Sequence, residues 1–242
     1  MTTAATLIIG IEILTGKIDD TNTRYLAREL FRLGVELRRV IVCPDDLDTI
    51  AADLNALRAA HDYVFTSGGV GPTHDDITID GVALAFGRPV VRSEEVAAII
   101  AHYYGDRLTE EHLRMANMPE GAQLIRNAEV PWPTVVIENV YVLPGVPEIF
   151  KMKFRALEER FRTDAPFVSH AVYTLCDEGT IAARLSELAA QFPNLTIGSY
   201  MKWDDADYRV KITFDGRDAD AVHAAADALV GSLPEEIVVR RE

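Results

Sequence analysis

A run of glycines and a pair of aspartates stand next to each other in residues 65–78, whose sequence is FTSGGVGPTHDDIT. Glycine lacks a Cβ, so this backbone can approach a ligand closely and direct its N–H groups at it. A helix expected from Ile77 would point its positive end at the same place. These features predict a phosphate-binding loop. The residues expected to contact the phosphate are Thr66, Ser67, Gly68, Gly69, Gly71, Pro72 and Thr73.

The two carboxylates of Asp75 and Asp76 would repel that phosphate. Two unit charges about 4 Å apart repel by about 4 kcal/mol at an effective dielectric constant of about 20. A divalent cation between them turns repulsion into bridging, because Mg²⁺ is typically held by carboxylates together with substrate phosphates. Such an ion also polarises phosphorus and supplies hydroxide. We therefore predict a site for Mg²⁺, Mn²⁺ or Co²⁺ here.

Both halves of this stretch also have a purely structural interpretation. Glycines after a strand often form only a tight turn. The segment from Thr73 to Asp76 fits a capping pattern, in which the carboxylates cap the following helix and complement its dipole. The structural and the chemical interpretations do not exclude each other.

Two flanking loops, residues 10–22 (GIEILTGKIDDTN) and 143–148 (LPGVPE), carry further polar residues. Glu12 is a candidate carboxylate ligand of the metal. Alternatively, it is a solvated charge at the end of a strand. Asn22 either caps a helix that starts at Thr23 or contacts the ligand. We include Glu12 among the catalytic candidates, with Asp75 and Asp76, and Asn22 among the substrate contacts.

The second flanking loop is a rigid turn before a helix, and its Glu148 is a candidate cap or ligand. Asp45 and Asp46 open another helix and are interpreted mainly as caps, although one of them could contact a nucleotide. The turn residues expected to contact the substrate are Pro144, Gly145 and Pro147.

The elements around these loops predict an α/β fold. The first 165 residues alternate strand and helix patterns, which is typical of a three-layer fold with a mostly parallel sheet between helices. Residues 5–14 predict a buried strand, residues 21–34 a helix that ends at Gly34, and residues 134–145 a hairpin. Ligands of such sheets bind beyond the carboxyl ends of the strands, where the three loops would meet.

A second, small domain is expected after a boundary near residues 162–167, which divides the chain into 1–165 and 166–242. Its strand and helix patterns follow the order βαββαβ of a ferredoxin-like α+β fold. From residue 167 onward it carries 7 Lys and Arg against 13 Asp and Glu, and it has no GxxG loop, so RNA binding is not expected. The acidic stretch WDDAD at 203–207 is interpreted as a solvated hairpin turn.

Composition limits the classes of partner. The 242 residues include 38 acidic and 24 basic ones, a net charge of −14, which argues against nucleic acid and anionic membranes as partners. The N-terminus lacks the basic region of a signal peptide, and no apolar run approaches the ~20 residues of a membrane span. Cys43 and Cys176 lie far apart without metal-ligand spacing, so a reducing cytoplasm is expected and a zinc site is not.

The three loops resemble the signature loops of the MoaB/Mog molybdopterin-binding family. The stretches SGGVGPTHDDIT, GIEILTGKIDDTN and PGVPE are most similar to the branch in the N-terminal part of CinA, the competence/damage-inducible protein, and to the related domain of eukaryotic FAD synthase. The resemblance covers residues 6–161, and the small second domain more weakly resembles the one that follows in CinA.

The resemblance implies a domain that binds a nucleotide or pterin through its phosphate. CinA-like members hydrolyse the pyrophosphate of ADP-ribose, and the FAD-synthase-linked domains hydrolyse FAD, both with a divalent metal. The residues that match the family motifs are Gly68, Gly69 and Gly71 of the phosphate loop, the acidic pair Asp75 and Asp76, Glu12, Asn22, and the turn Pro144, Gly145 and Pro147.

The sequence departs from the family pattern in two places. Ile11 stands where the family has Asp or Asn before the first-loop glutamate, which removes a polar ligand. The chain also ends at Glu242, before the amidohydrolase domain of full-length CinA, so deamidation of nicotinamide mononucleotide is not expected.

Three functional hypotheses follow. The first is a metal-dependent pyrophosphatase that acts on ADP-ribose, FAD or a similar dinucleotide. The second is a molybdenum-cofactor protein that binds or adenylylates molybdopterin. The third is a non-catalytic nucleotide-binding protein, which Ile11 favours. In each case the partner is a small nucleotide or pterin phosphate, and the family resemblance implies a homo-oligomer, a dimer or a trimer.

Overall fold

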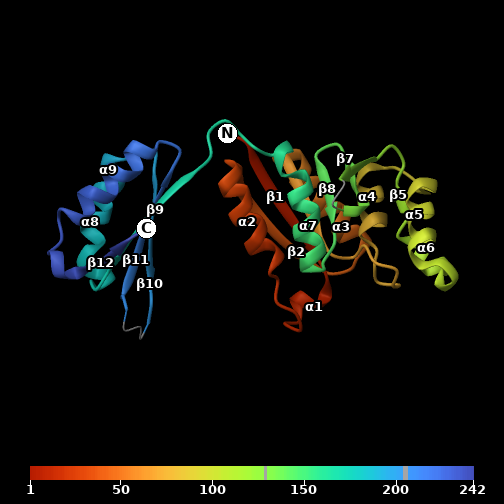
Figure 1. Cartoon of the computed structure of the whole chain (residues 1–242), viewed down its shortest axis with the longest axis horizontal. Helices are drawn as coiled ribbons and strands as arrows, with labels where there is room; N and C mark the ends of the chain where they lie inside the picture. The colour runs from red at the N-terminus through yellow and green to blue at the C-terminus, as the bar shows by residue number, and fades with distance from the viewer. Residues whose placement is uncertain (128–129, 204–206) are drawn as a thin grey trace. The chain divides into compact units, whose positions relative to one another are not determined.

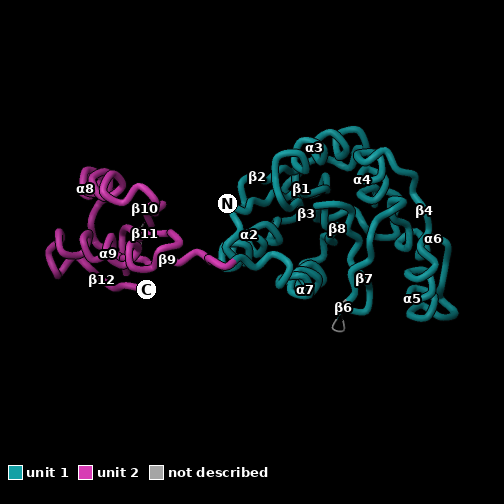
Figure 2. The backbone as a smooth tube through the Cα atoms, turned by 90° about the horizontal axis from the view of Figure 1, so that it is seen from above, with its two compact units in different colours: residues 1–163 teal, residues 164–242 magenta. Residues whose placement is uncertain are grey.

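The computed structural model describes residues 1–127, 130–203 and 207–242. The chain divides into two compact units, Met1–Thr163 and Asp164–Glu242 (Figure 2). The acidic stretch interpreted above as a hairpin turn lies, at residues 204–206, outside the described part of the chain.

Unit 1 is built on a six-stranded mixed sheet (Figure 1), and its strand order, β2-β1-β3-β8-β7-β6, can be followed in Figure 2. The neighbours from β2 to β8 are parallel, and β7 and β6 add antiparallel strands. The mostly parallel sheet and the terminal hairpin predicted from the sequence are thus confirmed. The strands are β1 (Thr3–Ile9), β2 (Glu36–Cys43), β3 (Tyr63–Ser67), β6 (Gln123–Asn127), β7 (Val130–Ile137) and β8 (Val140–Leu143).

Helices cover both faces of this sheet, which confirms the three layers. Helices α3 (Leu47–Ala60) and α4 (Thr78–Phe86) lie on one face, and α2 (Asn22–Leu33) and α7 (Pro147–Leu157) lie on the other (Figure 2). Helices α2 and α4 each end at a glycine in the left-handed conformation, Gly34 and Gly87, as their sequences predict.

A smaller lobe connects α4 to the antiparallel strands. It contains β4 (Val90–Arg92), α5 (Glu94–Tyr104), α6 (Glu110–Arg114) and β5 (Asn117–Pro119). Its own small core joins α5 to the residue before β5, Ala116.

The topology places the candidate loops at one edge. Because α2 follows β1 on one face and α3 precedes β3 on the other, the chain reverses its direction of winding between β1 and β3. Such a switch point is where open α/β sheets bind ligands, beyond the carboxyl ends of the strands. The loops after β1, β3 and β8 all leave the sheet at this edge.

One element was predicted wrongly. Residues 5–14 are not a single buried strand, since β1 ends at Ile9 and the one-turn helix α1 (Ile11–Leu14) follows. The Gly10 N–H still donates to the Cys43 carbonyl of β2, but the Ile11 N–H donates to the Asp45 side chain, so the chain leaves the sheet at Ile11. Ile11 and Leu14 are each 50% exposed, which shows that apolar character alone did not mark a buried strand.

Lys153 of α7 is a partly buried lysine. Its Nζ donates to the carbonyl oxygens of Trp132 and Pro133, at 3.0 and 2.7 Å. Burial disfavours the charged form and lowers the pKa of Lys153 from 10.5 to about 8.

We therefore predict that Lys153→Met changes how stability depends on pH. Between pH 8 and 10.5 the unfolded chain binds this proton more than the folded chain does. The free energy of unfolding of the parent should rise relative to that of the variant across this window, by about 3 kcal/mol. Urea unfolding of both proteins at several pH values measures the difference, and parallel profiles would contradict the prediction.

Unit 2 is a four-stranded antiparallel sheet with the order β10-β11-β9-β12. Its elements confirm the predicted βαββαβ order, and α8 and α9 pack their apolar residues against it. The elements are β9 (Val168–Thr174), α8 (Glu178–Gln191), β10 (Thr196–Met201), β11 (Val210–Gly216), α9 (Ala219–Val230) and β12 (Val238–Arg241).

None of the helices in the described parts of the chain is long and apolar enough to cross a membrane. Cys43 and Cys176 are both buried free thiols. Desolvation raises the pKa of Cys43 to about 12, so this thiol stays protonated at neutral pH.

Candidate phosphate-binding site

Gly68 holds the three loops together. Its N–H donates to the Leu143 carbonyl at the end of β8, at 3.3 Å. With φ at +104°, a Cβ on Gly68 would lie 2.2 Å from the Ile9 carbonyl oxygen at the end of β1. A Cβ on Gly145 would lie 3.3 Å from the Cα of Gly68. The glycines at these two positions therefore permit close packing of the loops, beyond any role in forming a turn.

Asn22 connects the same loops from α2. Its Nδ2 donates to Ser67 Oγ and to the Gly145 carbonyl, at 3.0 and 2.8 Å, and the residue is 4% exposed. Its Oδ1 is buried and has no hydrogen-bond partner within the described residues. Asn22 thus presents an unpaired acceptor at the junction of the loops.

The capping alternative for Asn22 is wrong. Asn22 is itself the first helical residue of α2 and Thr21 precedes it as the cap position. The helix start is bound by Asp20, whose Oδ1 accepts from the backbone N–H of Asn22 and of Thr23, both at 3.0 Å. The amide of Asn22 is therefore free to bind the other loops.

Replacing Asn22 by alanine should cost about 2 kcal/mol of unfolding free energy, because the buried Ser67 hydroxyl and the Gly145 carbonyl would both lose their donor. Urea unfolding measures this loss. Alanine at Asn55, on the exposed part of α3, is the control and should change stability by less than about 0.5 kcal/mol. Equal effects of the two substitutions would contradict the bridging role.

The hydroxyls expected to contact phosphate face the protein. Thr66 is fully buried, and its Oγ1 accepts from the Leu143 N–H at 3.4 Å. Ser67 is 3% exposed and accepts from Asn22. These two side chains support the loop from beneath, and the part of the loop that is accessible is the backbone from Gly69 to Thr73.

Asp76 closes the loop on itself. Its Oδ2 accepts from both the N–H and the Oγ1 of Thr73, at 2.8 and 2.5 Å, and lies where a Cβ on Gly71 would come within 2.6 Å. Helix α4 is preceded by Ile77, which has no capping side chain. The structure thus assigns Asp76 to the loop and not to the helix cap.

The start of α4 is instead fixed by Thr78, which belongs to the helix. Thr78 is fully buried, and its Oγ1 and N–H donate to the carbonyls of Gly68 and Gly69, at 2.8 and 2.9 Å. This double contact binds the glycine run to the helix N-terminus, whose positive end the sequence predicts to face the phosphate. The role of Thr78 was not foreseen, since a threonine in a helix start has no distinguishing spacing.

Asp75 remains exposed and charged. Its side chain is 62% exposed, and His74 lies 3.8 Å away. The nearby hydroxyl of Thr73, together with the backbone N–H of Asp75 itself, holds the pKa of Asp75 below its ordinary value. The carboxylate is thus available to a cation at neutral pH.

The three predicted metal ligands do not form a protein-only metal cage. Residues 1–127, 130–203 and 207–242 contain no group of three or more His, Cys, Asp or Glu side chains arranged to hold an ion. The carboxylate of Glu12 lies over Gly10, where it would meet a Cβ at 2.5 Å. The metal site therefore stays a prediction.

The acidic pair after β2 has two distinct roles. Asp46 caps α3 by accepting from the Thr49 N–H at 2.9 Å, as predicted. Asp45 accepts from the Ile11 N–H at 2.9 Å and so fixes α1, the helix that carries Glu12.

The turn after β8 supports the junction. Pro147 is the first residue of α7, a position where the missing N–H costs nothing, and Glu148 lies in the first turn. Within the protein, the Gly145 carbonyl of this turn accepts a hydrogen bond from the Asn22 side chain. Pro144 and Pro147 thus contribute rigidity to the turn.

The fold and these loops match a known family. Residues 5–163 match the family model described as "Probable molybdopterin binding domain", and residues 166–242 match the one described as "FAD synthase, middle domain". The chain belongs to the molybdopterin-binding domain family. The match confirms that the three loops resemble those of this family.

Members of this molybdopterin-binding domain family include proteins with different names. A protein of Caenorhabditis elegans named a probable FAD synthase is 34% identical over 263 residues, covering 98% of this chain and 51% of that protein. The CinA-like protein of Gemmatimonas aurantiaca is 31% identical, covering 92% and 56%. The chain therefore spans about half the length of these relatives.

A solved structure supports the CinA branch. The crystal structure of CinA from Thermoplasma acidophilum matches with a TM-score of 0.62 and 33% identity, covering 66% of this chain and 98% of that chain. The family's three-layer fold is therefore shared with a CinA protein.

Proposed function

We propose that the chain is a metal-dependent pyrophosphatase that cleaves a dinucleotide such as ADP-ribose or FAD. The observation that supports this most is the loop after β3, which joins a glycine backbone, the acidic pair Asp75 and Asp76 and the start of α4, and which packs at Gly68 against the loops after β1 and β8. The first two features bind phosphate, and the third binds a cation.

The chain's own groups have distinct tasks in this reaction. The backbone from Gly69 to Gly71 and the N-terminus of α4 hold one phosphate and orient it. The unpaired Oδ1 of Asn22 accepts a hydrogen bond from a donor on the ligand or from a water bound with it. Asp75 and the free oxygen of Asp76 would hold the metal. A divalent cation bound there would polarise phosphorus and lower the pKa of water.

Two other functions, pterin binding and nucleotide binding without turnover, are each supported by one observation. The family description names molybdopterin, which favours pterin binding at the same phosphate loop. Ile11, half exposed beside Glu12, favours nucleotide binding without turnover. Both alternatives use the same phosphate-binding loop, and they differ from the proposal in the ligand or in the absence of hydrolysis.

A substrate panel separates these functions. The purified chain is incubated with ADP-ribose or FAD and with Mg²⁺, Mn²⁺ or Co²⁺, and AMP release is measured, while calorimetry measures binding of the same ligands and of molybdopterin. Metal-dependent AMP release supports the proposal. Binding of a nucleotide without release under any metal supports the non-catalytic function, and tight molybdopterin binding alone supports the pterin function.

A further inference from the structure

Strand β10 is an unprotected edge of the sheet in unit 2. Its six residues, TIGSYM, include no charge and no proline, and its register with β11 is unbroken from Thr196 to Met201. The opposite edge, β12, contains a register shift and two arginines, Arg240 and Arg241. Shifts and charges of that kind prevent edge pairing, and β10 has neither.

The outward backbone groups of β10 can be assigned from its pairing. The Lys202 N–H donates to the Arg209 carbonyl, and hydrogen-bonded pairs alternate along an antiparallel ladder. Thr196, Gly198 and Tyr200 therefore bond to β11. The N–H and C=O groups of the alternate residues, Ile197, Ser199 and Met201, point away from the sheet.

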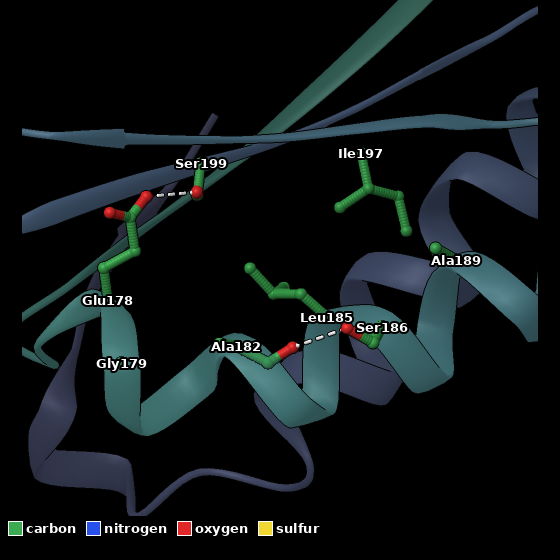
Figure 3. Close-up of a pocket in the computed structure, with 8 residues that line it drawn as sticks. All are labelled: Glu178, Gly179, Ala182, Leu185, Ser186, Ala189, Ile197 and Ser199. Carbon is green, nitrogen blue, oxygen red and sulfur yellow. Dashed lines mark hydrogen bonds between the residues drawn. The ribbon is translucent and has the colours of Figure 1, made fainter.

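A groove of about 580 Å³ runs beside this edge, between β10 and α8 (Figure 3). Leu185 and Ile197 point into the space between helix and strand, and the helical wall consists of small residues such as Ala182 and Ala189. A strand paired to β10 would place every second side chain in this groove. An open edge beside a groove is the arrangement that strand-addition modules use to bind extended peptides.

Charge selects the kind of peptide. Glu178 lies at one end of the groove, accepts a hydrogen bond from Ser199, and forms no ion pair within the described residues. From residue 167 onward the chain has 13 acidic against 7 basic residues. A second copy would bring the same negative charge, whereas a basic segment would be attracted.

We propose that the β10 edge and its groove bind an extended segment of another protein by strand addition. The segment alternates apolar side chains, which enter the groove, and carries a lysine or arginine that pairs with Glu178. This interaction is independent of the proposed pyrophosphatase site in unit 1.

The test selects peptides from a displayed library of random decapeptides on the immobilised full chain. We expect enriched sequences with alternating apolar residues and a basic residue. Met201→Pro removes an outward N–H without touching the ladder to β11, and should weaken binding of an enriched peptide at least 10-fold, with Met201→Ala as the control that keeps the N–H. Glu178→Gln should weaken it several-fold.

Ala182→Gln fills the groove and should also weaken binding, whereas Ala183→Gln, on the same helix but outside the groove, should not. Unchanged thermal unfolding of each variant shows that it is folded. The proposal is overturned if nothing enriches, if the enriched peptides are acidic, or if Met201→Pro and Ala182→Gln bind as the parent does. A parent dimer that Met201→Pro dissociates would assign the edge to a second copy and would also overturn it.

Discussion

Asp76→Asn is expected to lower metal-dependent AMP release roughly 100-fold, which corresponds to about 3 kcal/mol of activation free energy. Asparagine keeps an oxygen that can accept from the N–H and Oγ1 of Thr73, so the loop retains its closure. The substitution removes only the charge that the metal requires. Initial rates at saturating metal and substrate, compared with the parent, measure the effect.

The control for this prediction separates charge from loop closure. Thr73→Val deletes the hydroxyl that donates to Asp76 and leaves both carboxylates in place. It should cost about 1 kcal/mol of stability, the usual contribution of one hydrogen bond, and reduce turnover far less than Asp76→Asn does. If Asp76→Asn lowers stability and leaves turnover unchanged, the aspartate is structural.

Gly68→Ala is expected to destabilise unit 1 by about 3 kcal/mol and to abolish nucleotide binding. The methyl group would meet the Ile9 carbonyl oxygen at 2.2 Å, and a φ of +104° strains any residue with a Cβ. Backbone strain and overpacking each contribute about 1–3 kcal/mol. The end of β1 must then move, which separates it from the phosphate-binding loop. Urea unfolding and calorimetric titration with ADP-ribose measure the two effects.

Gly87→Ala is the matched control for Gly68→Ala. Gly87 also has a positive φ, +60°, but a Cβ there would meet nothing within 4 Å. It should cost only about 1 kcal/mol of strain and leave binding intact. Equal losses for the two variants would show that strain, and not contact with β1, determines the effect at Gly68.

Most of the fold could be predicted from the sequence, because most elements have a signal of their own. Buried apolar runs marked the central strands, and glycines in the left-handed conformation ended α2 and α4 where predicted. The hairpin turn at Glu138, with a φ of +50°, followed from two β-branched runs around it. Local patterns of this kind are independent of distant contacts.

The site was predicted less completely, because its parts depend on contacts between distant residues. The bridging role of Asn22 arises from residues 45 and 123 positions away, and a lone asparagine near a helix start gives no sign of them. The apolar residues of α1 were predicted as strand because the contact that ends the strand, between Ile11 and Asp45, joins residues 34 positions apart. Thr66 and Ser67 were assigned to the ligand, since sequence does not reveal which side of a loop a hydroxyl faces.

Hydrolysis of ADP-ribose in ¹⁸O-labelled water, with Mg²⁺ or Mn²⁺, tests most directly whether the junction at Gly68 cleaves a pyrophosphate bond. We predict release of AMP and ribose 5-phosphate, with one ¹⁸O incorporated at a single phosphorus per turnover, and loss of both products when metal is chelated. Binding of ADP-ribose with no labelled product, under every metal tested and with FAD as well, would contradict it.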